Sequence, residues 1–211
     1  ATNGDSFILG GNSPMWPSIG MVHGMRVTND NARSWWLFTQ LAKECFHRNW
    51  QHNNFWINDP DTVLLQNRLI TIVGPDGKET TIKQDSITND EFAVNAAYTM
   101  ASGGMVLSGD DVSGLREENI ELLRRLLPPT QVAAEFDDDT FTVGKAKIDD
   151  EKTIIYIFNY ENNEKEIIAS LDGKAEVFDL FENKSLGIFD GEIRFDSFKP
   201  HFAKTLICKK I

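Results

Sequence analysis

Three short clusters of polar side chains in the first half of the chain are chemically suited to binding and cleaving a sugar. They are Gly10–Pro14 with Trp16, the run from Arg26 to Asp30, and Asn58–Asp61. Cleavage of a glycosidic bond uses two carboxyl groups, one that protonates the departing oxygen and one that attacks the anomeric carbon or activates water. Tryptophan offers an apolar face to a sugar ring, while Arg and Asn donate to neighbouring hydroxyls. Aspartate in loops also caps helices and fixes turns, so composition alone leaves a structural role open.

Parallel βα units are expected to position these clusters, because residues 1 to about 128 alternate short apolar runs with helical stretches. The predicted strands are 6–9, 55–57 and 105–107, and the predicted helices are about 31–47, a helix that begins after Thr88, and about 116–127. Thr88 and Glu91 have the spacing of a capping box. In a parallel sheet, reactive residues gather at the carboxyl ends of the strands, where all three clusters and a weaker pair, Asp110–Asp111, are expected to lie.

The pattern changes after an acidic stretch at 137–139, where apolar residues begin to recur with a period of two. The expected strands are 140–148, 153–158, 166–171, 175–180, 192–195 and 202–208, joined by turns such as 149–150 and 172–173. Short strands without a convincing helix predict a small antiparallel β-sandwich. The chain is therefore expected to divide into residues 1–130 and residues 131–211.

Composition narrows the class of protein. The chain has 211 residues, 41% of them hydrophobic, and a formal net charge of −11. Such a charge argues against nucleic acid as a partner, because that affinity comes from Lys and Arg on phosphates. No apolar run reaches the roughly 18 to 20 residues of a membrane span, and no secretory leader pattern is present.

Metal sites and disulfides are not expected either. The four histidines show no metal-ligand spacing, and no cofactor-binding motif is present. Cys45 and Cys208 lie far apart in the sequence and are expected to be free, buried thiols. Nothing in this cysteine usage demands an oxidising compartment, which favours the cytoplasm.

Several motifs occur in a characteristic order along the chain. They are Ile8–Pro14, Gly20–Asp30 followed by Trp35–Trp36, Trp56–Asp61, Ser108–Asp111, Phe158–Tyr160, Phe178–Leu180, Leu186–Gly187 and Pro200–His201. Together they resemble the family 36 α-galactosidases, or melibiases, in which a Leu-Gly-Cys-Gly-type strand end precedes an Arg-x-x-x-Asp motif and a Trp-x-Asn-Asp-Pro-Asp block. The resemblance spans nearly the whole chain.

This resemblance implies a fold and a reaction. The fold would be the last βα units, about the sixth to the eighth, of a (β/α)₈ TIM barrel, followed by a small antiparallel β-sandwich. The reaction would be retaining hydrolysis of terminal α-galactosyl residues of oligosaccharides, with no cofactor and no metal. The unpaired edges of an incomplete barrel would also allow copies of the chain to associate as a homo-oligomer.

By resemblance, Asp30 is the catalytic acid/base, and Arg26 binds sugar hydroxyls beside it. A purely structural reading makes Asp30 the N-terminal cap of the following helix, and makes Arg26 a salt-bridge partner of Asp30 or Asp59. These readings are compatible with the catalytic ones. For Asp59 we expect a supporting role, in which the buried carboxylate holds Arg26 and the neighbouring loops in place.

The first cluster is expected to bind the substrate. Asn12 stands where related enzymes read the substituent at the second carbon of the sugar, and Gly11 replaces the cysteine usual in the family. A side-chain amide can serve a 2-hydroxyl or a 2-acetamido group, so galactose is favoured while N-acetylgalactosamine or another α-sugar stays open. Trp16 is expected either to stack on a sugar ring or to pack in its loop.

The nucleophile of the family is an aspartate in a Lys-x-Asp motif on an earlier barrel strand, and no such segment precedes Ser6. The chain is therefore expected to be a portion of a longer parent enzyme and to be inactive alone. The alternative is a non-catalytic carbohydrate-binding or structural module derived from the same fold.

Overall fold

The computed structural model describes residues 4–83 and 86–211, so the first three residues of the predicted 1–130 domain lie outside it. Three parallel strands form the first sheet, in the order β1 (Leu9–Gly10), β2 (Gly24–Arg26) and β3 (Ile57–Asp59). A second parallel pair follows, β4 (Thr62–Val63) and β7 (Leu107–Ser108). The amide of Met105 donates to the carbonyl of Asn58 at 2.8 Å, which links the approach to β7 with β3. Strands close to the predicted 6–9, 55–57 and 105–107 are therefore present, at Leu9–Gly10, Ile57–Asp59 and Leu107–Ser108, whereas β2 and β4 were not predicted.

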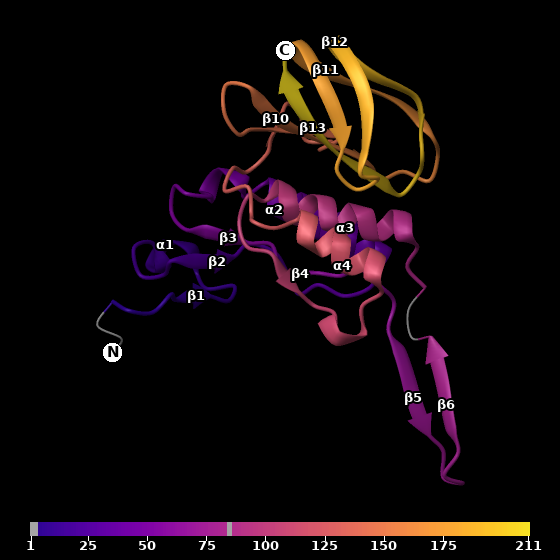
Figure 1. Ribbon diagram of the computed structural model, residues 1–211. Coiled ribbons are helices and arrows are strands. Elements are labelled where there is room, and N and C mark those ends of the chain that lie inside the picture. The colour runs from indigo at the N-terminus through magenta and orange to yellow at the C-terminus, as the bar shows by residue number, and fades with distance from the viewer. Residues whose placement is uncertain (1–3, 84–85) are drawn as a thin grey trace.

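Helices connect these strands and form a layer of their own. They are α1 (Met15–Ser18), α2 (Trp35–Phe46), α3 (Asn89–Ala101) and α4 (Glu117–Arg125), with 3₁₀ turns η1 (Asn49–Gln51) and η2 (Val112–Gly114). The predicted capping box at the start of α3 is confirmed: Glu91 N donates to Thr88 Oγ1 at 3.2 Å, and Thr88 N donates to Glu91 Oε2 at 2.8 Å. Figure 1 shows α2, α3 and α4 between the short parallel strands and the C-terminal sheet.

A hairpin that we did not predict interrupts the βα pattern. Strands β5 (Leu69–Val73) and β6 (Glu79–Lys83) pair antiparallel and project away from the rest of the molecule, as Figure 1 shows. Their turn contains Gly77 with φ of +74°, a left-handed conformation that glycine adopts without strain. The hairpin lies between β4 and α3, on the carboxyl side of a parallel strand.

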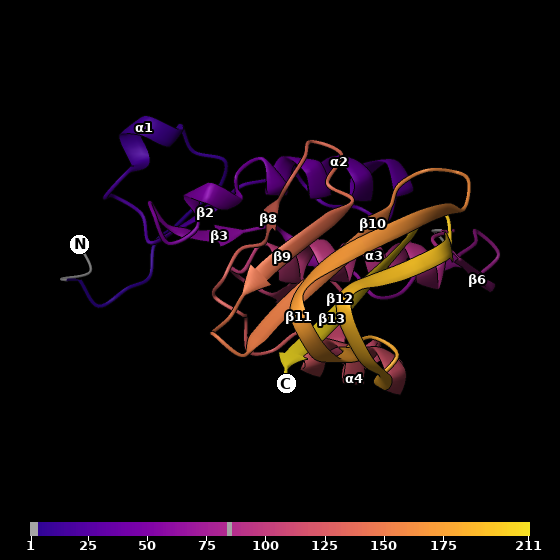
Figure 2. The ribbon, with the colours of Figure 1, turned by 90° about the horizontal axis from the view of Figure 1, so that it is seen from above.

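The C-terminal half forms a six-stranded antiparallel sheet in the order β12-β11-β13-β10-β9-β8. The strands are β8 (Glu135–Phe136), β9 (Val143–Lys147), β10 (Lys152–Asn159), β11 (Lys165–Asp179), β12 (Lys184–Phe198) and β13 (Phe202–Lys210). The two long strands β11 and β12 curve over the others in Figure 2, which folds the sheet back on itself.

The prediction of a turn at 172–173 was wrong. Both residues lie inside β11, where the register with β12 shifts between Ser170 and Lys174. Gly173 has φ of +88°, so the glycine produces an irregularity in a continuous strand rather than a chain reversal. The bend lets the two halves of β11 contact different partners, because only Ala175–Asp179 also pairs with β13.

Boundaries near the site also differ from the expectation. The strand expected at 55–57 is shifted to Ile57–Asp59, so Asn58 and Asp59 belong to β3 instead of following it. The helix expected from about residue 31 begins at Trp35, because residues 27–34 form a loop in which Asn31 is held by Asp61 and by Thr62 of β4.

One hydrophobic core joins the parallel and antiparallel parts. Phe46 at the end of α2 packs against Phe158 of β10, with ring centroids 5.3 Å apart, and against Phe136 of β8 at 4.3 Å. Tyr156 of β10 is fully buried and donates to the carbonyl of Met100 in α3 at 3.4 Å. This core therefore extends across the change of strand pattern near residue 130, while a second cluster, which includes Ile157 and Val177, lies within the antiparallel sheet alone.

The expectation of free, buried thiols is confirmed for Cys45 and Cys208. Within residues 4–83 and 86–211, no helix has the length and apolar character needed to span a membrane.

Candidate active site

The side chain of Arg26 is the centre of the candidate site. Arg26 is the last residue of β2, and in the sheet register it lies directly opposite Asp59, the last residue of β3. Register partners on neighbouring parallel strands direct their side chains to the same face. Arg26 Nε therefore lies 3.9 Å from Asp59 Oδ2 at the carboxyl end of the sheet, as the sequence predicted.

Asp30 occupies the loop that follows β2 and contacts the same guanidinium. Arg26 Nη1 donates to Asp30 Oδ1 at 2.8 Å, while the Asp30 side chain is 92% exposed. Asp30 is not the helix cap that the structural reading proposed, because the N-cap of α2 is Ser34. Its carboxylate is thus oriented by one cation and otherwise open to an incoming molecule.

Asp61 also binds Arg26, and the sequence analysis missed it. Arg26 Nη2 lies 3.0 Å from Asp61 Oδ1, closer than Arg26 comes to Asp59. The other carboxylate oxygen of Asp61 accepts a hydrogen bond of 2.5 Å from the backbone amide of Asn31, the neighbour of Asp30. The Asn-Asp-Pro-Asp motif could have indicated this role, because Asp61 lies only two residues beyond β3, at the carboxyl end of the sheet.

Asp59 is buried beneath this arrangement. Its Oδ1 accepts the amide of Asp61 at 2.8 Å, which holds the chain in a tight turn where Asp61 has φ of +69°. Burial raises the pKa of Asp59, and this effect outweighs the opposing hydrogen bond from the Asp61 amide and the nearby charge of Arg26. A buried carboxylate with these contacts supports the turn that places Asp61 on Arg26.

A polar cavity of about 290 Å³ adjoins β2 and brings Asn12 and Arg26 together. Asn12 has φ of +53° and is exposed, and Glu44 of α2 and Arg48 also line the cavity. Glu44 accepts two hydrogen bonds from Asn29, each of 2.8 Å, which fixes the loop that carries Asp30.

The other two predicted substrate-binding residues do not line this cavity in the described part of the chain. Gly11 is exposed beside Asn12, and a methyl group added at its α-carbon would meet open space. Trp16 lies on α1 and its side chain is 71% exposed. Their roles in substrate binding therefore stay predictions.

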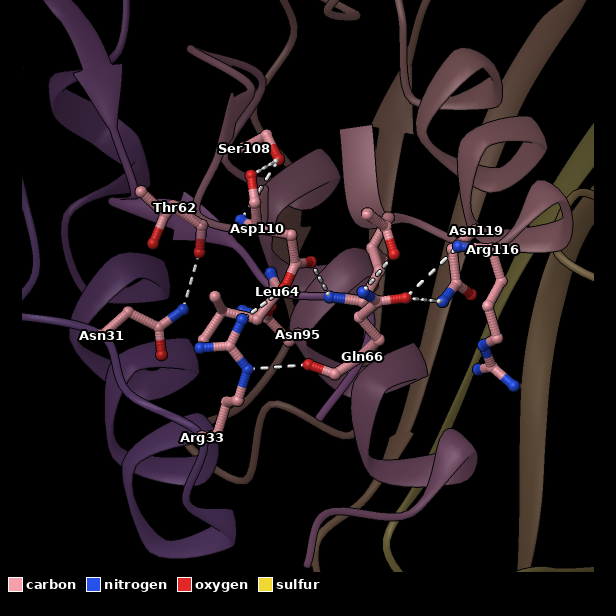
Figure 3. A network of polar contacts seen from close by, with 12 residues as sticks. Asn31, Arg33, Thr62, Leu64, Gln66, Asn95, Ser108, Asp110, Arg116 and Asn119 are labelled. Atoms are coloured by element: carbon pink, nitrogen blue, oxygen red, sulfur yellow. Dashed lines mark hydrogen bonds and ion pairs between the residues drawn. The ribbon is translucent and has the colours of Figure 1, made fainter. Parts of the chain in front are cut away.

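A buried polar network braces the loops around the site (Figure 3). The guanidinium of Arg33 forms an ion pair with Asp110, and their side chains are only 6% and 1% exposed. Arg33 Nε also donates to the carbonyl of Gln66 at 2.7 Å. Asp110 accepts the amide of Leu65 at 2.7 Å, so one pair joins the loops after β2, β4 and β7.

Asparagines extend this network into the helices and strands. Asn31 donates to the carbonyl of Thr62 at 2.6 Å, and Asn95 of α3 accepts the amide of Leu64 at 2.5 Å. Figure 3 shows these side chains converging on the segment 62–66 that leaves β4. Asp110, proposed from sequence as part of a fourth reactive cluster, is instead occupied in holding this segment.

In the part of the chain that the structure describes, no group of three or more His, Cys, Asp or Glu side chains is arranged to hold a metal ion. The polar groups that the structure places at the site are carboxylates around one guanidinium, together with the Asn12 amide.

Comparison with known proteins relates this arrangement to glycoside hydrolases. No family model matches the chain. A GH27 β-L-arabinopyranosidase from Geobacillus stearothermophilus superimposes with a TM-score of 0.75 at 16% identity, over 95% of this chain and 50% of that protein. α-Galactosidase I from Mortierella vinacea gives a TM-score of 0.65 at 14% identity, over 92% and 54% of the two chains. An α-galactosidase from Saccharomyces cerevisiae gives 0.64 at 8% identity, over 91% and 60%.

These identities show a shared fold. The chain spans about half the length of the solved structures it matches, so it is similar to part of a glycoside hydrolase. The likeness includes a GH27 enzyme, from a family related to family 36, and membership of family 36 itself stays a prediction. The chain thus shares the fold of part of such enzymes, with its charged cluster at the carboxyl ends of parallel strands.

Proposed function

We propose that this chain is the C-terminal portion of a retaining α-galactosidase, in which residues 1–130 contribute the last units of a (β/α)₈ barrel and residues 131–211 a β-sandwich. Asp30 is the acid/base of this enzyme. The observation that carries the proposal is the contact of 2.8 Å between Arg26 and an aspartate whose side chain is 92% exposed. An enzyme needs such a carboxyl group to be both oriented and reachable by the glycosidic oxygen.

The proposed mechanism has two steps. Asp30 donates its proton to the departing oxygen while a second carboxylate attacks the anomeric carbon, and the Asp30 carboxylate then removes a proton from the water that releases the sugar. The second carboxylate belongs to an earlier barrel strand of the intact protein. Asp59 and Asp61 do not fill this role, because both are buried and engaged with Arg26 or with backbone amides.

The unpaired edge of strand β1 supports the assignment to a larger barrel. In residues 4–83 and 86–211, β1 pairs with β2 alone, and the apolar side chains of Phe7, Ile8 and Leu9 around it are exposed. Apolar residues along an unpaired strand edge are normally covered in a finished structure. Additional parallel strands would cover them.

Arg26 would hold the sugar through one arm of its guanidinium while Asp61 retains the other. Asn12 shares a cavity with Arg26 and would read the substituent at the second carbon of the sugar. Two of the similar solved structures are α-galactosidases, which favours an α-galactoside as the substrate. Measured affinities of the intact protein for an α-galactoside and for an N-acetylgalactosaminide would distinguish the two.

The test compares leaving groups in the intact protein. The Asp30→Asn variant should hydrolyse natural α-galactosides roughly 10²- to 10⁴-fold more slowly, because it cannot protonate the leaving oxygen. An aryl α-galactoside with an acidic phenol needs little protonation, so its first step should be slowed much less.

Asp150→Asn is the matched control, since Asp150 is also exposed and pairs with a nearby cation, Lys147, at 3.1 Å. Equal losses on both substrates, or a loss no greater than that of the control, would remove Asp30 from the acid/base role.

A further inference from the structure

The loop of residues 27–34, which carries Asp30, borders two different cavities. Asn29, just before Asp30, lines the cavity of about 290 Å³ that also contains Asn12. Arg33, at the other end of the loop, lines a second hollow of about 970 Å³. The α-carbons of Asp30 and Arg33 are at most about 11 Å apart, because three residues of extended chain span no more than that. Along the loop, Asp30 therefore lies between the two cavities.

We call the second space the Asn67 hollow. Its polar lining comes from several segments and is defined by Arg33, Gln66, Asn67, Ser86, Asn89 and Arg116. Gln66 lies three residues beyond β4, and Gly109, which also lines the hollow, directly follows β7. The hollow is therefore at the carboxyl ends of these parallel strands, the end of an α/β sheet at which substrates bind.

Gln66 holds two walls of the hollow together. Its Nε2 donates to the carbonyl of Gly114 at 2.9 Å, and its Oε1 accepts the amide of Arg116 at 3.3 Å. Its backbone carbonyl accepts the bond of 2.7 Å from Arg33. Figure 3 shows Gln66 between Arg33 and Arg116. One residue thus joins the Asp30 loop to the start of α4.

Asn67 fixes a third wall, the base of the β5–β6 hairpin. Its Nδ2 donates to the carbonyl of Ile87 at 2.7 Å, and its Oδ1 accepts the Ile87 amide at 2.9 Å. The chain that enters β5 is therefore bonded to the chain that has left β6. Asn67 and Ser86 both line the hollow, so the hairpin that projects in Figure 1 rises from its edge.

Exposed polar groups remain available in the hollow. Ser86 and Asn89 are exposed and present a hydroxyl group and a side-chain amide. The side chain of Arg116 is 53% exposed, and its Nη1 lies 3.1 Å from Glu118, which leaves the other guanidinium nitrogens for a ligand. These groups offer donors and an acceptor on walls that other contacts hold in place.

The charges of the lining favour a neutral ligand. Arg33 and Asp110 form a buried ion pair and neutralise each other. The other charged lining residues are Arg68, Arg116 and Asp111, so both signs are present. Hydroxyl groups suit such a lining, because each one both donates and accepts.

The position of Asp30 assigns a part of the substrate to each cavity. A glycosidase acid protonates the oxygen that joins the terminal sugar to the rest of the molecule, so the two parts of the substrate must meet at the acid. The cavity that contains Asn12 and Arg26 is assigned to the terminal sugar. The Asn67 hollow lies at the other end of the Asp30 loop, where the departing part can extend.

We propose that the Asn67 hollow binds the departing part of the substrate, and that the substrate is an oligosaccharide with at least two sugar units beyond the terminal one. Asn89 and Arg116 are then specificity-determining residues. This inference rests on the proposed function and adds the class of substrate to it.

The experiment compares two substrates of the intact protein, raffinose and a small aryl α-galactoside. Raffinose carries two sugar units beyond its galactose, whereas the aryl group is too small to fill the hollow. Asn89→Trp places a bulky side chain in the hollow, and Arg116→Ala removes a donor. Each variant should lower the ratio of kcat/KM for raffinose to kcat/KM for the aryl substrate about tenfold, a change of about 1.4 kcal/mol.

Matched controls place the same changes elsewhere. Asn163→Trp alters another exposed asparagine, and Arg124→Ala removes another exposed guanidinium of the α4 region, 64% exposed. Neither residue lines the Asn67 hollow. Both controls should keep the substrate ratio of the unaltered protein.

The outcomes separate this inference from the proposed function. Hydrolysis of both substrates with an unchanged ratio in Asn89→Trp and Arg116→Ala would overturn the inference and leave the proposed function standing. Equal losses on the two substrates would also overturn it, because they would report damage to the catalytic site or to the fold. Failure of the unaltered intact protein to hydrolyse either substrate would overturn both.

Discussion

Arg26 Nη2 lies 3.0 Å from Oδ1 of Asp61, a buried aspartate two residues beyond the end of β3. The same guanidinium reaches the exposed Asp30 through Nη1 at 2.8 Å. One arm is therefore anchored inside the protein and the other extends to solvent. The fork shape of arginine makes this division feasible, because its donors lie in a fixed plane.

Arg26→Lys is predicted to lower kcat/KM of the intact enzyme about 10- to 100-fold, mainly through KM. Lysine keeps the charge but cannot contact Asp61 and Asp30 in two directions at once. Steady-state kinetics on an α-galactoside measures the effect, with Arg124→Lys at an exposed helical pair as the control. Kinetics equal to those of the control would show that the fork is not used.

The buried Arg33–Asp110 pair is predicted to be a large contributor to loop stability. Arg33→Ala leaves the buried carboxylate of Asp110 without its cation, which costs roughly 3–5 kcal/mol. Urea unfolding of the intact protein measures this free energy. Arg124→Ala, at an exposed pair, should change it by less than about 1 kcal/mol. Similar losses for the exposed and the buried variants would refute the bracing role.

Local patterns of the sequence predicted most elements of the fold. The capping box at Thr88 fixed the start of α3, and the switch to a period of two located the antiparallel sheet. The hairpin of β5 and β6 was not predicted although it has a Gly-Pro-Asp-Gly turn, because a regular βα alternation contains no antiparallel pair between a strand and the next helix. The bend of β11 was misread, since a glycine in a bulge and a glycine in a turn look alike locally.

The site was predictable in part. Arg26 and Asp30 are four residues apart, so their contact follows from one short motif. Arg33 and Asp110 are 77 residues apart, and their pairing depends on how three loops meet above the strands. Single-sequence patterns do not contain that information. Asp61 is an intermediate case. Its Asn-Asp-Pro-Asp motif is visible in the sequence, but its contact with Arg26 depends on the turn that Asp59 stabilises.

Stability is predicted to depend on the protonation of His52. Burial lowers its pKa in the folded protein, whereas the unfolded chain has the ordinary value of 6.5. The unfolded state therefore binds more protons just below pH 6.5, so the stability that this neutral histidine contributes is present above 6.5 and is lost as the pH falls.

His52→Gln should reduce the fall in unfolding free energy below pH 6.5. Denaturant titrations of the intact protein at several pH values test this, with His47→Gln, at an exposed histidine, as the control. An unchanged slope in His52→Gln would contradict the lowered pKa of His52.

Both thiols are predicted to resist modification in the native protein. Burial raises the pKa of Cys45, and it raises the pKa of Cys208 to about 12, so neither forms the reactive thiolate near neutral pH. A thiol reagent such as Ellman's should react with both only after unfolding. Rapid reaction of either thiol under native conditions would mean that the core around that thiol opens readily.

Chemical rescue tests the role of Asp30 most directly. In the intact Asp30→Ala variant, a retaining enzyme would still form its glycosyl intermediate from an activated aryl α-galactoside, and azide would enter the space left by the carboxylate. Displacement of the nucleophile by azide from that face restores the original configuration. We predict that azide raises the turnover of Asp30→Ala and that NMR identifies the product as α-galactosyl azide. A β-galactosyl azide would make Asp30 the nucleophile, and turnover equal to that of the unaltered enzyme without azide would contradict any catalytic role for it.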